Sequence, residues 1–291
     1  MGILKQVFGA RAGKRVSRSM GGDLGIFSLM IVVAAFMCLP FVYAIMQSLK
    51  PMEEIFIFPP RFFVRNPTFE NFRMIGRFAN SLWVPFSRYL SNSVVVTVTA
   101  TLGQIVFCSM AAFVLSKGSL RGRKVLFSTI VAMLLFSYEV TAIPLYIVLS
   151  RMNLVDTHGA LILPMFAAPL GLFLMKQYME TVPIAVIESA RVDGAGPFLV
   201  YARIVMPTVK PAWLTLVILS FQAIWSREGL EFIYSEQLKV VPTLLRQISA
   251  GGIARVGIGA AAAVIMMIPP IVTFVVSQSR VIETMAHSGI K

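Results

Sequence analysis

Long apolar stretches separated by polar segments constrain this chain more than any other feature of its sequence. A helix that crosses a bilayer needs about 20 mostly apolar residues, because each residue rises about 1.5 Å across a hydrocarbon core of about 30 Å. Charged residues make up only 13% of the 291 positions, whereas soluble domains carry about 25%. The sequence therefore predicts an all-α transmembrane protein of about six helices. The expected spans are 26–48, 92–115, 125–149, 160–178, 211–225 and 257–277.

The spans are expected to form one transmembrane domain, residues 26–278, between a basic leader at 1–25 and a tail at 279–291. The first apolar run exceeds 20 residues and lacks a small-residue cleavage site. Signal peptides have apolar runs of only about 7–15 residues, so an uncleaved span is favoured. The segment 50–91 is rich in proline and aromatic residues, and we expect it to be extended and turn-rich because proline interrupts helices.

The basic residues indicate how the spans are oriented, since lysine and arginine near span ends stay in the cytoplasm. The segment 116–124 has four basic residues in nine, whereas 150–159 has only Arg151, which Asp156 balances. Both termini are therefore expected in the cytoplasm. The net charge of +13 fits attraction to anionic lipid headgroups. No basic groove interleaved with aromatic residues accompanies it, so nucleic acid is not an expected partner.

A polar, glycine-punctuated segment, 181–210, lies between the fourth and fifth spans. Pro183 suits the first turn of a helix, and Gly194 can adopt the positive φ of a turn. Apolar residues then give each half of the segment one apolar side: Ile184, Ile187 and Val192, followed by Phe198, Tyr201, Ile204 and Val205. The pattern predicts a helix, a tight turn and a second helix, which can insert into a groove on a partner. The alternative is an ordinary solvated connection.

The same segment carries residues at fixed spacings. Glu188-Ser189-Ala190 is followed after three residues by Gly194, after nine more by Ile204, and then by Met206-Pro207. This spacing resembles the coupling loop of ABC-importer permeases, whose pattern is Glu-Ala-Ala, three residues, Gly, nine residues, Ile, one residue and Leu-Pro. Ser189 stands in place of an alanine and Met206 in place of the leucine.

The resemblance implies a type I ABC importer permease fold whose coupling loop docks on a separate ATPase dimer, which binds ATP and Mg. By this resemblance Glu188 pairs with a basic group of the ATPase, Ala190 allows close approach and Gly194 forms the turn. Ile204 and Pro207 pack the loop against the permease. The expected coupling residues are Glu188, Ser189, Ala190, Asp193, Gly194, Ile204 and Pro207.

Further motifs are similar to the carbohydrate-uptake, maltose-permease-like branch: Ser48–Pro51, Asn66–Phe72, Asn92-Ser93 and 277–291. This likeness implies a permease subunit of an ATP-driven, binding-protein-dependent importer that passes oligosaccharides across the bacterial cytoplasmic membrane. It also implies a second, homologous permease and an external solute-binding protein. The loop 226–255 is expected to reach toward that protein through Tyr234, Glu236, Gly251 and Gly252.

Polar residues within the spans are candidates for the substrate path, because such groups are costly in a bilayer and usually face a cavity. Glu139, beside Tyr138, is the only acidic residue well inside an expected span. It can accept hydrogen bonds from sugar hydroxyls, or it can tie two helices together. Asn92, Gln104 and Gln222 are weaker candidates because they can equally pack helices. Trp225 can stack on a pyranose ring or anchor the membrane interface.

No catalytic site is predicted in this chain. The glycine-rich stretch 251–259 lacks the Lys-Ser/Thr of a phosphate-binding loop. His158 and His287 are isolated, so no metal site or catalytic triad is expected. The chain is therefore expected to be a transport subunit without enzymatic activity.

Two interpretations of the function remain open besides sugar import by an ABC importer. The chain could be a permease for peptides or another small solute, or a secondary transporter that uses Glu139 as an ion site. Within the sugar reading, the outer loops carry more basic than acidic residues, which favours acidic oligosaccharides through electrostatic steering. The segment 231–291 is also similar to permeases for uronate-containing oligosaccharides.

Overall fold

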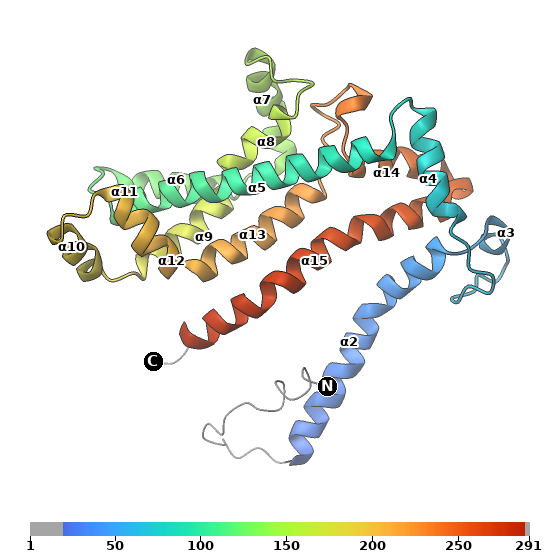
Figure 1. The fold of residues 1–291 in the computed structure, drawn as a ribbon, viewed down its shortest axis with the longest axis horizontal. Helices are drawn as coiled ribbons and strands as arrows, with labels where there is room; N and C mark the ends of the chain where they lie inside the picture. Colours follow the sequence, from blue (N-terminus) through green and yellow to red (C-terminus); the bar gives the residue numbers. More distant parts are fainter. Residues whose placement is uncertain (1–19, 289–291) are drawn as a thin grey trace.

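The computed structural model describes residues 20–288, and it is helical with no strand in that part of the chain (Figure 1). Most of the expected leader, 1–25, and the last three residues of the tail lie outside the described residues, as do the side chains from 279 onward. The bounds of leader, domain and tail therefore stay predictions.

Four helical segments are long and apolar enough to cross a membrane, and the number rises to six if each of two bent helix pairs counts as one span. This agrees with the expected all-α transmembrane class. The main helices of these spans are α2 (Met20–Ser48), α5 (Phe86–Lys117), α6 (Arg123–Met133), α7 (Tyr138–Arg151), α8 (Gly159–Phe166), α9 (Pro169–Glu180), α13 (Lys210–Trp225) and α15 (Val256–Ser288). In the second bent pair, α13 follows the helical segment Pro197–Thr208 at an angle of 78°.

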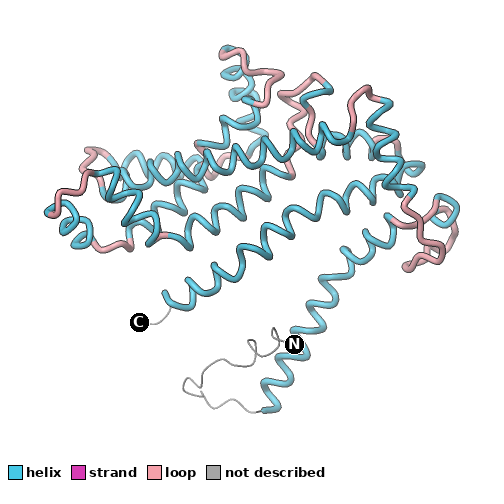
Figure 2. The backbone as a smooth tube through the Cα atoms, viewed as in Figure 1, coloured by secondary structure: helices cyan, strands magenta, loops and turns pink. Residues whose placement is uncertain are grey.

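Helices α5, α9, α13 and α15 run roughly along one direction, α2 is inclined to them, and loops lie at both ends of this bundle and around α7 (Figure 2). Helix α5 lies at the centre, where it packs against α8, α9 and α13, and α13 in turn packs against α15. Helix α2 packs mainly against α15 and is otherwise exposed along most of its length. The chain therefore presents a large unpartnered apolar surface on α2, as expected for a helix that faces lipid or another membrane subunit.

The third expected span, 125–149, is built from two helices and not from one straight helix. Helix α6 ends at Met133, and α7 starts at Tyr138 after a bend of 110°. The amides of residues 134–136 bond three residues back, which tightens the end of α6, and Ser137 is extended. No proline or glycine occurs at residues 134–137, so no local signal marks the break. Helix α7 then projects away from the bundle (Figure 1).

The fourth span is also interrupted, between α8 and α9. Pro169 begins α9. Ala168 is extended, which is the conformation that a residue before proline prefers. The thiol of Cys108 lies 3.5 Å from the Phe166 carbonyl oxygen and 3.7 Å from that of Ala168. The thiol thus donates to backbone acceptors at the break and has a structural role.

The segment 50–91 contains more helix than its composition predicts. Helices α3 (Met52–Ile55) and α4 (Glu70–Ser81) form within it, and α5 starts at Phe86. No proline occurs between residues 67 and 85, so nothing prevents α4 from forming there. Asn71, Ile75 and Ala79 of α4 are buried at a spacing of four, and α4 packs against α15. The expectation of an extended segment was therefore wrong for residues 70–81.

Candidate functional site

Residues 183–209 form a compact projection at one end of the bundle, which we call the knob (Figure 1). It consists of helix α10 (Ile184–Val192), a turn, α11 (Pro197–Leu199), the π-helix η1 (Val200–Val205) and α12 (Met206–Thr208). Pro183 directly precedes α10, close to the first turn that the sequence predicted for it, and Pro197 opens α11. The predicted helix, turn and second helix are therefore present, with a π-helical segment that was not foreseen.

The turn at the tip of the knob closes α10 through two backbone hydrogen bonds. The Ala195 N–H donates to the Ala190 carbonyl at 2.9 Å, and the Gly194 N–H donates to the Arg191 carbonyl at 3.0 Å. Gly194 has a φ of +85°, which is the left-handed conformation that this helix ending requires. Ala190 and Ala195 both pack against the core below. The spacing of Ala190 and Gly194 in the motif therefore has a direct structural cause.

The base of the knob is held by apolar side chains. Ile187, Val200, Val205 and Val209 are buried among residues of α5, α9 and α13. The spacing of five between Val200 and Val205 matches a π-helical turn, which keeps both on the buried face. Ile204 and Pro207 were expected to pack against the permease. In the structure Pro207 is exposed and Ile204 is only half-buried. The three valines make that contact instead.

Polar contacts also connect the knob to α5. The Tyr201 and Ser109 hydroxyl oxygens lie 2.7 Å apart. Directly before the knob, the Lys117 Nζ donates to the Val182 carbonyl at 2.6 Å and to the Glu180 carbonyl at 3.1 Å. A displacement of the knob therefore acts directly on the central span.

The outer face of the knob carries the remaining motif residues. Glu188, Ser189 and Asp193 are exposed, and the carboxylates of Glu188 and Asp193 have no ion pair with any other residue that the structure describes. The knob also exposes apolar side chains, of which Ile184, Val192 and Phe198 belong to the apolar sides that the sequence predicts can insert into a partner's groove. These exposed side chains are Ile184, Val186, Val192, Phe198 and Leu199. A surface with an apolar area and unpaired carboxylates is suited to docking against a basic, apolar partner groove.

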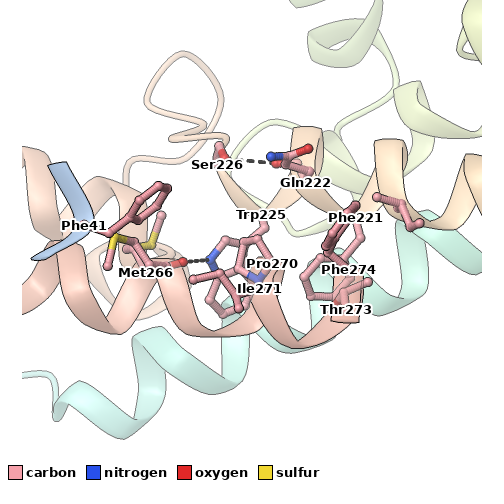
Figure 3. Close-up of a pocket in the computed structure, with 12 residues that line it drawn as sticks. Phe41, Phe221, Gln222, Trp225, Ser226, Met266, Pro270, Ile271, Thr273 and Phe274 are labelled. Atoms are coloured by element: carbon pink, nitrogen blue, oxygen red, sulfur yellow. Dashed lines mark hydrogen bonds between the residues drawn. The ribbon is translucent and has the colours of Figure 1, made fainter. Parts of the chain in front are cut away.

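The candidate path residues on α13 flank a cavity of about 420 Å³ between α13, α15 and Phe41 of α2 (Figure 3). Gln222 is exposed at its edge, whereas most of the wall is apolar. Trp225 is buried, and its Nε1 donates to the Met266 carbonyl at 3.0 Å. Pro270 has no N–H to bond that carbonyl, so Trp225 supplies the missing donor within α15. Trp225 thus joins two spans.

Two other candidate path residues also serve packing. The buried Asn92 amide donates to the Gln237 carbonyl at 2.8 Å and to the Lys239 carbonyl at 3.0 Å. Gln104 is buried against Gly171 of α9, where an added Cβ would lie 2.7 Å from its Nε2. These polar groups hold neighbouring segments together.

Tyr138 and Glu139 start α7 directly after the bend, and both are exposed. Glu139 was expected well inside a span. It lies instead at the start of a helix, directly after the bend. The Tyr138 hydroxyl donates to Glu231 Oε1 at 3.2 Å, so the start of α7 contacts the segment that follows α13.

The loop 226–255 contains the 3₁₀-helix η2 (Glu236–Leu238), helix α14 (Val241–Ser249) and the 3₁₀-helix η3 (Gly252–Arg255). Tyr234 is exposed, and so are Gly251 and Gly252. Glu236 accepts hydrogen bonds from Tyr89 at 2.7 Å and from Gln247 at 3.2 Å, and it pairs with Lys239. Burial raises the pKa of Glu236, but these hydrogen bonds outweigh it, so the pKa lies below its ordinary value.

Asp156, in the short connection between α7 and α8, fixes the same loop. Its Oδ1 accepts from the Tyr234 N–H at 2.9 Å and the Ser235 N–H at 2.8 Å, and the Ser235 hydroxyl also donates to this carboxylate. The hydrogen bonds from Ser235, followed by the one from Tyr234, hold the pKa of Asp156 below its ordinary value.

No group of three or more metal-ligating side chains occurs among residues 20–288.

Comparisons with known proteins match this architecture. The chain is 29% identical over 262 residues to a putative ABC transporter permease protein of a Caldicellulosiruptor species, covering 87% of this chain and 91% of that one. It is 25% identical over 273 residues to an arabinooligosaccharides transport system permease protein of Halalkalibacterium halodurans, covering 91% and 94%.

A solved structure shares the fold. The chain aligns with a TM-score of 0.74 and 20% identity to a bacterial ABC transporter involved in the import of the acidic polysaccharide alginate, covering 91% of this chain and 99% of that one. The profile described as the binding-protein-dependent transport system inner membrane component matches residues 104–285, more than half of the chain and the whole of the knob. The chain therefore belongs to the family of inner membrane components of binding-protein-dependent transport systems, and it is a multi-pass transport subunit of the ABC importer type.

Proposed function

We propose that this chain passes oligosaccharides across the bacterial cytoplasmic membrane as one of two homologous permeases, driven by an ATPase dimer that binds ATP and Mg. An external solute-binding protein delivers the sugar. The observation that carries the proposal is the knob, whose unpaired carboxylates and exposed apolar side chains surround a turn fixed by Gly194. Permease relatives of sugar-uptake systems support the substrate class.

In this proposal the knob lies in the cytoplasm and docks on the ATPase. Glu188 pairs with a basic group of the ATPase, while Phe198 and Val192 fill its apolar groove. The exposed Ser189 and Asp193 line the rim of the contact. Closure of the ATPase dimer then pushes the knob, and its buried valines transmit the movement to α5, α9 and α13.

The opposite end of the bundle lies outside the cell in this proposal. The part of the loop 226–255 that approaches the binding protein contains Gly251 and Gly252, because both residues are exposed. Gly252 has a φ of +65°, the left-handed conformation of a turn. Gln222 and the cavity beside it face the translocation path. The substrate is an acidic oligosaccharide, which agrees with the positive charge of the outer loops and with the alginate importer that shares the fold.

The test is purification of the tagged chain from its native membrane in mild detergent, followed by uptake assays in proteoliposomes. We expect an ATPase and a second permease to copurify, and we expect ATP-dependent uptake of acidic oligosaccharides in the presence of the binding protein. Glu188→Ala should reduce uptake by at least about tenfold without loss of the protein from the membrane. Glu53→Ala, which removes an exposed carboxylate outside the knob, is the matched control.

Recovery of the chain alone, with uptake driven by an ion gradient, would contradict the proposal and favour a secondary transporter. Uptake of neutral sugars only would contradict the proposed acidic substrate but not the proposed importer function.

A further inference from the structure

Five side chains from two distant parts of the sequence meet beside the bend between α6 and α7. We call them the tyrosine–arginine cluster: Tyr138 and Tyr146 of α7, with Arg227, Glu231 and Tyr234 after α13. The Tyr138 hydroxyl donates to Glu231 Oε1 at 3.2 Å, and the Tyr234 hydroxyl donates to that of Tyr146 at 3.4 Å. The Arg227 guanidinium carbon lies 4.5 Å from the centroid of the Tyr138 ring.

The three tyrosine rings of the cluster are open to the outside of the described structure. Tyr138 and Tyr146 are 38% and 37% exposed, and Tyr234 is 57% exposed. Exposed aromatic rings with a polar tip supply flat apolar faces together with hydroxyl donors and acceptors. A sugar ring needs this combination, because its C–H faces are apolar and its edge carries hydroxyls.

Arg227 differs from other arginines near the same end of the bundle. Arg77 pairs with Glu70 and Arg246 pairs with Glu228, each at 2.6 Å. Within the described part of the chain Arg227 has no carboxylate within 4.0 Å; its neighbours are the Tyr138 ring and the Met165 sulfur, at 3.6 Å. The side chain is half-buried, so a guanidinium is held in place with donors left for a ligand. Such a planar fork matches a carboxylate, which it binds through two hydrogen bonds.

The cluster is held in a fixed position. Asp156 accepts hydrogen bonds from the backbone of Tyr234 and Ser235, and Phe232 and Ile233 beside Glu231 are buried in the core. A site whose side chains are anchored before the ligand arrives loses less entropy on binding.

We propose that the tyrosine–arginine cluster is a binding subsite for a carboxylated sugar unit of the oligosaccharide. Arg227 binds the carboxylate, Tyr138 and Tyr234 contact the sugar ring, and Glu231 accepts a hydrogen bond from a sugar hydroxyl. The inference rests on the proposed function of sugar import, and it adds the class of sugar and the residues that select it.

The experiment compares two oligosaccharides of equal length in proteoliposomes that contain the complete importer and its binding protein. One has its carboxyl groups intact and the other has them reduced to alcohols. Arg227→Gln should raise KM for the carboxylated oligosaccharide about tenfold or more, because a charge-assisted pair is lost. It should change KM for the reduced oligosaccharide less than about twofold. Arg77→Gln, which removes an outer charge outside the cluster, should change neither.

A second variant keeps the test decisive if Arg227→Gln does not assemble. Tyr234→Ala leaves the backbone bonds to Asp156 in place, and it should raise KM for both oligosaccharides by a similar factor, since both share the sugar ring. Equal effects of Arg227→Gln on the two sugars would overturn the proposal. Weaker binding of the unloaded binding protein to the Arg227→Gln complex would also overturn it and identify a protein contact. If the wild-type importer takes up neither sugar, the proposed function itself fails.

Discussion

The knob and the loop 226–255 are both polar segments that join two spans, but they use their polar residues in opposite ways. In the knob, Glu188 and Asp193 are exposed and have no ion pair among the described residues. In the loop, Glu236 accepts hydrogen bonds from Tyr89 and Gln247, and Asp156 of the connection between α7 and α8 accepts one from the Tyr234 N–H. Carboxylates that remain unpaired on a well-held surface are available to a partner, whereas Glu236 and Asp156 already stabilise the fold.

The two segments are fixed to the bundle in different ways. The knob is held mainly by buried valines and Ile187. The loop also buries Phe232, Val241 and Leu244, and in addition it is hydrogen-bonded to the first turns of α5, where the Asn92 amide donates to the Gln237 carbonyl and the Ser93 hydroxyl oxygen accepts from the Val241 N–H. Apolar contacts are non-directional, whereas hydrogen bonds require a fixed geometry. We therefore expect the knob to shift against the bundle more easily than the loop does.

Ile187→Ala should have the largest effect on the folded protein, because it opens a cavity under the knob. Ile187 is 1% exposed, and truncating a buried isoleucine costs about 2–5 kcal/mol. Ile184→Ala is the matched control one helical turn earlier, since Ile184 is 59% exposed. Thermal unfolding in detergent should show a lower midpoint for Ile187→Ala alone, while Ile184→Ala should reduce only ATPase retention. Equal unfolding midpoints for the two variants would mean that the knob is not held by its apolar base.

Gly194→Val should follow, because it strains the turn without a steric clash. No atom lies within 4 Å of a Cβ built at Gly194, so the cost comes from the φ of +85° alone, about 1–3 kcal/mol. Gly194→Asn is the control, since asparagine tolerates this conformation better. We expect ATP-dependent uptake to fall strongly for valine and only slightly for asparagine. Equal uptake by both variants would show that the turn geometry does not matter for coupling.

Asn92→Ala should have a smaller effect on stability, by leaving two carbonyl groups of the loop without a donor. The expected cost is about 1–3 kcal/mol, measured as a lower unfolding midpoint. Ser91→Ala, at the neighbouring exposed position, should have little effect. If Asn92→Ala raised KM for the sugar and left stability unchanged, Asn92 would belong to the substrate path instead.

The smallest effect is expected from pH. The pKa values of Asp156 and Glu236 are lowered in the folded protein, so their contribution to stability is present above about pH 4 and is lost as the pH falls further. The unfolding midpoint of the wild type should drop between about pH 5 and pH 3, and Asp156→Asn should reduce that drop. An unchanged pH dependence in Asp156→Asn would show that this carboxylate does not hold the loop.

Much of the fold could be predicted from the sequence, and so could the turn of the knob. The apolar stretches located the spans because a bilayer sets a minimum helix length. Gly194 marked the turn because glycine adopts a positive φ without a steric cost. The bend at residues 134–137 could not be predicted, since no proline or glycine marks it. The apolar sides of the knob were expected from the sequence, but their spacing could not show that Ile187 and Val205 are buried while Ile184 and Val192 are exposed.

The sequence by itself determined that the chain crosses a membrane as a bundle of helices and that a polar knob interrupts it between two spans. Hydropathy, helix length and glycine conformation are local properties, so they can be read from the order of residues. Only the tertiary structure decided that Asn92, Gln104 and Trp225 join segments, and that Arg227 lies over the Tyr138 ring with no ion pair among the described residues. The role of a polar side chain depends on which distant groups the fold brings within hydrogen-bonding distance, and that is fixed by packing between the helices.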